Sequence, residues 1–294
     1  MHQTNAPDRA GIALAIGSYA IWGVLPIYFH LLSGVPALQV LSHRVVWSVV
    51  LLVPIVLALR RGRAVLAAAR GRTLLYLIAS AALIAVNWLV YIWAVQHGHV
   101  LEASLGYFIN PLVSVALGIL VLGERLRRLQ GVAIGFAGVG VVILAVSGGG
   151  AIGISIALAL SFAFYGLVRK VAAIDALGGL TVETVLLTPL AAGWLLHAAQ
   201  AGTTGFGTSP GTNALILAAG VITATPLLMF AAATRRLPLS MMGLLQYIAP
   251  TLQFCVALAL GEPLHLVHIV TFALIWTGCA LFTWDSVRAA RARI

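Results

Sequence analysis

Charged residues are scarce in this sequence. Only 8% of its 294 residues are Asp, Glu, Lys or Arg, and only seven are acidic, whereas 62% are hydrophobic. A soluble domain carries about 25% charged and about 50% apolar residues. The polar side chains are too few to cover a globule in water, so we predict an all-α polytopic membrane protein.

Cysteine and the common nucleotide and metal motifs are also scarce or missing. The two cysteines, Cys255 and Cys279, both lie in apolar segments, and two such residues indicate no disulfide framework. The patterns G-x-x-x-x-G-K-[ST] and H-E-x-x-H are absent, so no direct use of ATP and no metalloprotease site is predicted. We expect no cofactor and no metal site.

Long apolar runs divide the chain into ten segments. A helix needs about 20 residues to cross a bilayer, with about 17 to 25 tolerated. The connections between the segments are short, and none has room for a soluble domain. The ten predicted spans are residues 11–29, 37–59, 73–96, 101–122, 130–146, 151–168, 180–197, 211–233, 239–260 and 266–284.

The basic residues predict how these spans are oriented. Sixteen of the 17 Lys and Arg residues fall in the N-terminal tail (1–10), the alternate connections on one side and the C-terminal tail (285–294). Lys and Arg accumulate on the cytoplasmic side of membrane proteins, so both termini are predicted to be cytoplasmic. The net charge of +10 is therefore attributed to membrane topology, and no nucleic acid partner is expected.

Two pairs of similar segments indicate an internal repeat. Ser18–Leu25 in the first span resembles Ser161–Val168 in the sixth, and Ser104–Glu124 in the fourth resembles Gly243–Glu262 in the ninth. Five spans separate the copies, and five is odd, so the two halves must face opposite ways across the membrane. We therefore predict two inverted five-helix repeats, 11–146 and 151–284, with a site between them near the midplane.

Four stretches carry a family resemblance. They are LEASLGYFINPLVSVALGILVLGERLRRLQ (101–130), YAIWGVLPIYF (19–29), SHRVVWS (42–48) and LLQYIAPTLQF (244–254). These motifs, spread over nearly the whole chain, resemble RarD-type members of the EamA family of drug/metabolite transporters. The resemblance implies ten helices around a central cavity, a bacterial plasma (inner) membrane location, and transport, often export, of amino-acid-like or amphiphilic metabolites.

Arg44 is the strongest single candidate for a functional residue. It lies seven residues into the second span, roughly 10 Å below the outer helix end at about 1.5 Å per residue. An ionised side chain at that depth is costly and marks a functional site by default. Arg44 can bind an anionic group of a solute, form an ion pair with Glu102, or extend to the outer interface. His43 and Trp47 are predicted to share its flank of the helix.

Further polar and aromatic residues are expected around a central cavity. Each of the aromatic rings can instead be core packing, and each amide can instead bond helix to helix. Aromatic walls with few polar groups suit amphiphilic or aromatic solutes. The candidates are Trp22, Asn87, Tyr91, Tyr107, Asn110, Tyr165, Gln246 and Tyr247.

Two acids and two prolines complete the predicted site. Glu102 and Glu183 each lie near a helix start, where the helix dipole favours a carboxylate, and each is also a candidate for an ion pair or proton coupling. Pro111 and Pro250 interrupt the fourth and ninth spans, because proline frees a backbone carbonyl and breaks or bends a helix. We predict a hinge at each proline.

These features favour a secondary transporter that works by alternating access between inverted repeats. Its expected partners are a small-molecule solute and the lipid bilayer, as a monomer or homodimer. The alternative is a membrane-embedded enzyme acting on a lipid or polyprenyl substrate, which should show acids or metal ligands clustered at one depth. A channel should instead show rings of like residues.

Overall fold

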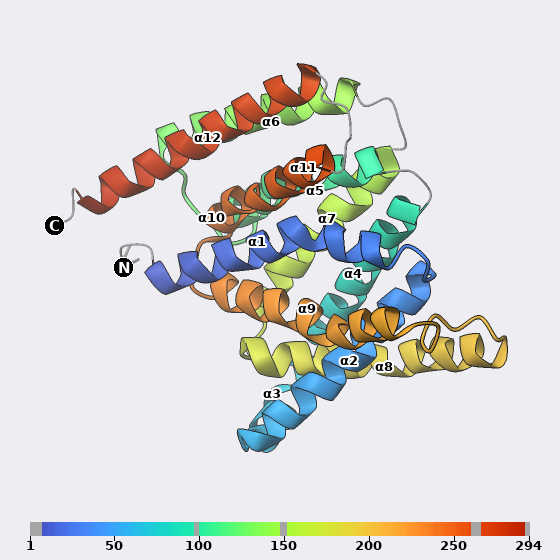
Figure 1. Cartoon of the computed structure of the whole chain (residues 1–294). Helices are drawn as coiled ribbons and strands as arrows, with labels where there is room; N and C mark the ends of the chain where they lie inside the picture. Colours follow the sequence, from blue (N-terminus) through green and yellow to red (C-terminus); the bar gives the residue numbers. More distant parts are fainter. Residues whose placement is uncertain (1–7, 97–99, 148–151, 260–265, 292–294) are drawn as a thin grey trace.

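The computed structural model describes residues 8–96, 100–147, 152–259 and 266–291, and every secondary-structure element in these ranges is an α-helix (Figure 1). Polar caps begin several helices; Asp8 and Asp175, for example, accept backbone N–H groups of the first turns of α1 and α8. The helices are α1 (Arg9–Leu31), α2 (Ala37–Ala58), α3 (Gly62–Ala68), α4 (Gly71–Gln96), α5 (Val100–Leu120), α6 (Arg128–Ser147), α7 (Ile152–Val171), α8 (Ala176–Gln200), α9 (Pro210–Thr234), α10 (Leu239–Leu245), α11 (Ile248–Ala259) and α12 (Leu266–Arg291).

The predicted spans coincide with these helices to within a few residues. In the described part of the chain, α1, α2, α4, α7, α8 and α9 are long and apolar enough to cross a membrane. Shorter apolar stretches lie in α5, α6, α10–α11 and α12. Two helical regions were not predicted. The short helix α3 follows α2, and α12 continues through the predicted basic tail as far as Arg291.

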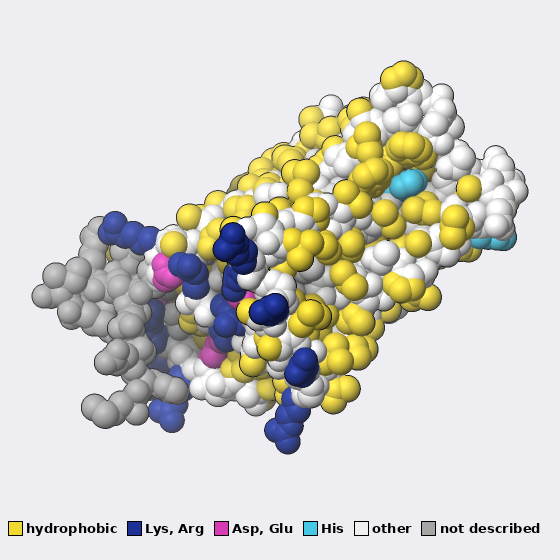
Figure 2. All heavy atoms as spheres, turned by 90° about the horizontal axis from the view of Figure 1, so that it is seen from below, with side chains coloured by type: hydrophobic (Ala, Val, Ile, Leu, Met, Phe, Trp, Pro, Cys, Tyr) yellow, Lys and Arg dark blue, Asp and Glu magenta, His cyan; other side chains and the backbone are white. Residues whose placement is uncertain are grey.

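The outer surface of the bundle is apolar along its flank. Large side chains such as Leu120, Val146 and Leu190 are more than three-quarters exposed. Figure 2 shows hydrophobic atoms covering the middle of the visible face, with Lys and Arg gathered towards one end. Contiguous apolar surface of this extent needs a lipid environment, as expected for a multi-pass membrane protein.

Exposed ion pairs mark the end where the basic residues gather, which we call the basic end. Arg236 pairs with Asp8 at 3.1 Å, joining the end of α9 to the start of α1. Arg61 pairs with Asp175 at 3.0 Å, joining the α2–α3 connection to the start of α8. Both pairs are exposed and screened by water, so each contributes little to the stability of the fold. They identify which helix ends lie together.

Helices from the two halves of the chain pack against one another. α1 packs on α9 and α11, whereas α7 packs on α4 and α5. α2 lies against α8 and α9, and α6 lies along α12 at one side of the bundle (Figure 1). The main core is therefore built between the halves and not within either half.

The two proline segments have different backbones. The predicted interruption of the fourth span at Pro111 is wrong, because α5 runs through this residue without a break. The ninth span is broken, since α10 ends before Gln246 and α11 begins after Tyr247. Pro250 cannot donate to the Gln246 carbonyl, which accepts instead from the N–H of Ala249 at 3.0 Å. The break therefore precedes Pro250 by one turn.

Close contacts hold α5 on two sides of Pro111. Asn110 Nδ2 donates to the Ala159 carbonyl of α7 at 2.7 Å, which anchors α5 beside Pro111. On the other side, a Cβ added at Gly243 would lie 2.7 Å from the Pro111 carbonyl oxygen. Only a glycine lets α10 approach α5 so closely.

We predict that Gly243→Val destabilises the protein by about 2 kcal/mol, because the added side chain separates α10 from α5. The measurement is the unfolding temperature of protein purified in detergent. Gly135→Val is the matched control, since nothing lies within 4 Å of a Cβ built at Gly135. The two variants make the same change in helix propensity. Equal losses of unfolding temperature would contradict this account of the contact.

Candidate functional site

A cavity lies between the two halves of the chain. Half of its lining residues are aromatic, and the others include one arginine and three amide side chains. About 50 Å³ is open to the centre of a water molecule, which is room for only a few waters. A larger solute therefore requires the walls to move. The lining residues are Tyr19, Trp22, Leu25 and Phe29 of α1, Arg44 of α2, Asn87, Trp88 and Tyr91 of α4, Tyr107 of α5, Phe162 of α7, and Gln246, Ala249, Pro250 and Gln253 of the α10–α11 segment.

Arg44 supplies the charge of this cavity. It is 3% exposed, and its Nε donates to Thr223 Oγ1 of α9 at 2.9 Å. The guanidinium carbon lies 4.6 Å from the ring centroid of Trp88 and 5.3 Å from that of Phe29, so two aromatic faces stabilise the cation. No described carboxylate pairs with it, and the side chain of Glu102 lies outside the described residues.

The guanidinium has unused hydrogen-bonding capacity. Its only hydrogen bond to a described residue uses Nε, so the Nη groups keep donors that none of these residues takes. Arginine presents such donors as a planar fork that matches a carboxylate or phosphate group. Because Arg44 lines the cavity, this fork can meet an anionic group there.

A hydrogen-bonded group from three helices holds the wall beside Arg44. Asn87 Nδ2 donates to the Leu158 carbonyl at 3.1 Å and to Ser161 Oγ at 3.0 Å, which joins α4 to α7. The Tyr107 hydroxyl donates to Asn87 Oδ1 at 3.4 Å. The rings of Tyr91 and Tyr107 meet edge to face, with centroids 5.4 Å apart. Asn87 therefore positions the aromatic wall while it faces the cavity.

Several sequence-predicted residues meet in this cavity, and others do not. Those that line it are Trp22, Arg44, Asn87, Tyr91, Tyr107, Gln246 and Pro250. His43 and Trp47 lie outside the lining, although they neighbour Arg44 on α2. His43 packs against Phe206 with ring centroids 5.8 Å apart, and Trp47 packs beneath Gly220 of α9.

The remaining predicted residues occupy nearby layers. Asn110 bonds α7 as described above, beside Pro111. Tyr247 is buried with Phe108, at 6.4 Å between ring centroids. Tyr165 is fully buried below the cavity and stacks on Phe230 at 5.9 Å. None of these three belongs to the cavity lining.

The sequence reasoning missed several lining residues. Phe162 and Tyr19 occupy matching places in the first pair of similar segments, where Trp22 and Tyr165 were noted. Comparing every aromatic of that pair would have found both. Thr223 carried no signal, because a single threonine in an apolar helix is common and its partner on α2 is distant in sequence.

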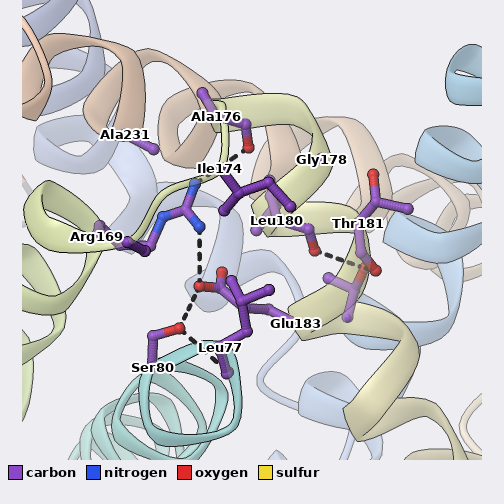
Figure 3. Close-up of polar contacts among 12 residues, drawn as sticks. Leu77, Ser80, Arg169, Ile174, Ala176, Gly178, Leu180, Thr181, Glu183 and Ala231 are labelled. Carbon is purple, nitrogen blue, oxygen red and sulfur yellow. Dashed lines mark hydrogen bonds and ion pairs between the residues drawn. The ribbon is translucent and has the colours of Figure 1, made fainter. Parts of the chain in front are cut away.

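A second buried polar cluster lies towards the basic end, on α4, α7 and α8 (Figure 3). Arg169 and Glu183 are each 1% exposed, and Arg169 Nη1 lies 3.2 Å from Glu183 Oε1. Ser80 Oγ donates to the same carboxylate oxygen. Arg169 Nη2 also donates to the Ala176 carbonyl at 3.2 Å. The sequence predicts Arg169 in a basic connection, whereas the structure buries its side chain.

Gly179 makes room for this cluster. A Cβ at Gly179 would lie 1.9 Å from Arg169 Nη1, so the guanidinium occupies the space of the missing side chain. In the described part of the chain, no group of three or more His, Cys, Asp and Glu side chains could hold a metal ion. The cluster is therefore an ion pair with a hydroxyl donor.

These features define a polytopic membrane protein with a cation in a buried cavity between two sets of helices. Sequence comparisons specify it further. The sequence model of the EamA-like transporter family matches residues 9–146. The chain is 44% identical over 286 residues to Protein RarD of Escherichia coli strain K12, an alignment that covers 96% of this chain and 97% of that protein. The chain belongs to the EamA family and to its RarD group.

Two further comparisons agree with this assignment. An uncharacterized transporter of Vibrio cholerae is 45% identical over 287 residues, covering 97% of this chain and 95% of that protein. A solved crystal structure has a TM-score of 0.72 over 94% of this chain and 98% of that one; at 18% identity it shows the fold alone. The protein is therefore a multi-pass protein of the bacterial inner membrane, and its relatives point away from an enzyme.

We predict that Gly179→Ala lowers the free energy of unfolding by about 3 kcal/mol, because the added methyl displaces Arg169 from Glu183 and leaves buried charges without partners. Thermal unfolding in detergent measures the loss. Gly193→Ala on the same helix is the control, since nothing lies within 4 Å of a Cβ there. If both variants unfold at the same temperature, the guanidinium keeps its bonds in a shifted position and the prediction is wrong.

Proposed function

We propose that the protein is a secondary transporter of small organic solutes that carry an aromatic or amphiphilic body and an anionic group. Its ten spans form two inverted five-helix repeats, with both termini in the cytoplasm. The solute binds between the repeats and is exposed to each side of the membrane in turn. Export is the expected direction, by similarity to RarD-type proteins.

The mirrored helix contacts support the inverted repeats. If the first five spans exchange places with the last five, α1 replaces α7 and α4 replaces α9. The contact of α1 with α9 then maps onto that of α7 with α4. Individual bonds follow the same exchange. Ser18 Oγ donates to the Pro226 carbonyl between α1 and α9, and Ser161 Oγ accepts from Asn87 between α7 and α4.

Arg44 is the observation that carries the proposal. Burial of a cation inside a membrane bundle is unfavourable, and a bound anion recovers the lost interaction with water. Here the guanidinium faces a cavity, and its Nη groups bond no described residue. The surrounding rings of Trp22, Trp88 and Phe162 offer stacking surfaces for an aromatic or apolar solute body. Charge and shape together favour an amphiphilic anion.

The narrow cavity and the broken ninth span suggest how the site opens. The cavity has room for only a few waters, so a larger solute can bind only if its walls separate. Gln246 and Pro250 line it and flank the break between α10 and α11. We propose that this break is the hinge, and that the contact of α10 with Pro111 transmits its movement to α5.

We predict that Arg44→Gln lowers the flux of an aromatic carboxylate in proteoliposomes by about 100-fold, because an ionised hydrogen-bonding partner contributes about 1.5 to 3 kcal/mol. The panel pairs each carboxylic acid with its neutral amide, for example indole-3-acetate with indole-3-acetamide. Arg44 should favour the acid, and Arg44→Gln should remove the difference. The direction of transport is measured in proteoliposomes that contain the protein in either orientation, with the solute loaded inside or added outside.

Arg61→Gln is the matched control, since it removes an exposed arginine from the basic end and leaves the cavity intact. Its flux should equal that of the unmodified protein. Unchanged acid selectivity in Arg44→Gln would exclude Arg44 from solute binding. Chemical turnover of the solute, with no flux, would favour a membrane enzyme.

A further inference from the structure

The buried cluster of Arg169, Glu183 and Ser80 lies between the cavity and the basic end. On α4, Asn87 lines the cavity, Ile84 lies one turn nearer the basic end and Ser80 a further turn along. Ile84 and Ser80 are 1% and 0% exposed. Separation of these buried side chains would open a path for water from the basic end towards the cavity.

The bonds of the cluster join the two halves of the chain. Ser80 belongs to α4 in the first half, whereas Arg169 and Glu183 belong to α7 and α8 in the second (Figure 3). Both donors use the same carboxylate oxygen, Oε1. The shared oxygen makes Glu183 the point at which three helices are held together.

The bonding of the carboxylate is incomplete. Glu183 Oε2 and Arg169 Nε are buried and make no hydrogen bond. The Tyr165 hydroxyl lies close enough to Glu183 to interact with it, but it meets no hydrogen-bond geometry there. A buried carboxylate held by one oxygen is stabilised less than one held by both. Oε2 is therefore an available position for a proton.

Glu183 is also the counterpart of Arg44. Each is the eighth residue of its helix, since α2 begins at Ala37 and α8 begins at Ala176. Each is hydrogen-bonded to a hydroxyl group from the other half of the chain. Glu183 accepts from the hydroxyl of Ser80, and Arg44 donates to the hydroxyl of Thr223. The two repeats thus carry opposite charges at equivalent positions, one facing the cavity and one sealed in an ion pair.

We propose that Glu183 is a proton-binding site and that its protonation opens the basic-end side of the cavity. The proposal rests on the transporter function above and adds the coupling ion. A proton from water binds Glu183 Oε2 and gives the neutral acid, so the ion pair with Arg169 is lost. Arg169 keeps its charge and its backbone acceptors at Asp175 and Ala176. When the helices close again, the proton returns to water.

Proton binding to Glu183 and the movement of the helices are coupled, because each changes the equilibrium of the other. Contact with Arg169 favours the ionised carboxylate. Protonation leaves the Arg169 guanidinium buried without its anionic partner, and the guanidinium gains contact with water when the helices separate. A movement that separates α7 from α8 therefore promotes proton uptake, and proton uptake promotes that movement by the same free energy. The groups facing the carboxylate are Arg169 and Tyr165 from α7 and Ser80 from α4. From α2 and α9, no described titratable side chain contacts it.

The test uses a thiol at a buried position of α4 between Asn87, which lines the cavity, and Ser80 of the cluster. Ile84→Cys is introduced into a chain that carries Cys255→Ser and Cys279→Ser. An impermeant maleimide is applied to the basic-end side in membrane vesicles, from about pH 8.5 to about pH 5, a range that brackets a perturbed glutamic acid. Labelling is normalised to denatured protein at the same pH, which removes the effect of pH on the thiol.

With Glu183 present, labelling of the introduced thiol should rise about tenfold or more as the pH falls, because protonation breaks a buried pair. Glu183→Gln should be labelled strongly at every pH. Arg61→Gln, which breaks only the exposed pair with Asp175, should behave as the parent. Labelling that does not respond to pH in the parent, or a pH response that persists in Glu183→Gln, would overturn the proposal.

A second variant tests the proposal even if Glu183→Gln does not fold. Ser80→Ala removes a donor to the ionised carboxylate without removing a charge. The midpoint of labelling should then move to higher pH, and an unmoved midpoint would also count against the proposal. The labelling assay needs no solute. Absence of flux with intact pH-dependent labelling would therefore reject the transporter function and leave the proton site standing.

Discussion

The cost of placing an ionised group in an apolar interior governs this structure. A lipid-facing bundle offers no water to its core, so every buried charge must find a partner inside the protein. Arg169 and Glu183 meet this requirement with each other, which holds α7 against α8 and draws in α4 through Ser80. Arg44 meets it only in part, with one hydroxyl and two aromatic faces. The paired charges hold helices together, and the cation without a described carboxylate partner faces a cavity.

This contrast gives a physical basis for a transport cycle. If equally strong contacts closed both ends of a bundle, neither end would open in preference to the other. Here α2 carries a cation that lacks a described carboxylate partner, and α8 carries an anion that has a cationic partner. A solute anion at Arg44 and a proton at Glu183 would each change the charge balance of one half of the chain. In the proposed cycle, alternation between the two sides follows from which of these charges is neutralised.

Some features of this protein could be predicted from the sequence and others could not. The helix positions were predictable because a spanning helix must satisfy its own backbone within one continuous apolar run. Arg44 was predictable because a single charge inside such a run stands out. The break at Gln246 and the continuity at Pro111 were not distinguishable, since both segments contain a proline in similar surroundings. Packing decides between them, through the contact of Gly243 with α5.

By itself, the sequence determined that this is a multi-pass membrane protein with a repeated pattern and one cation buried in a span, because composition and periodicity act locally along the chain. Tertiary structure alone decided which aromatic rings face Arg44. It also decided that Arg169, which resembles a cytoplasmic loop residue, is buried against Glu183. Both outcomes depend on how helices distant in sequence rotate and approach. That is set by the shapes of the meeting surfaces, such as the space at Gly179, which no local pattern encodes.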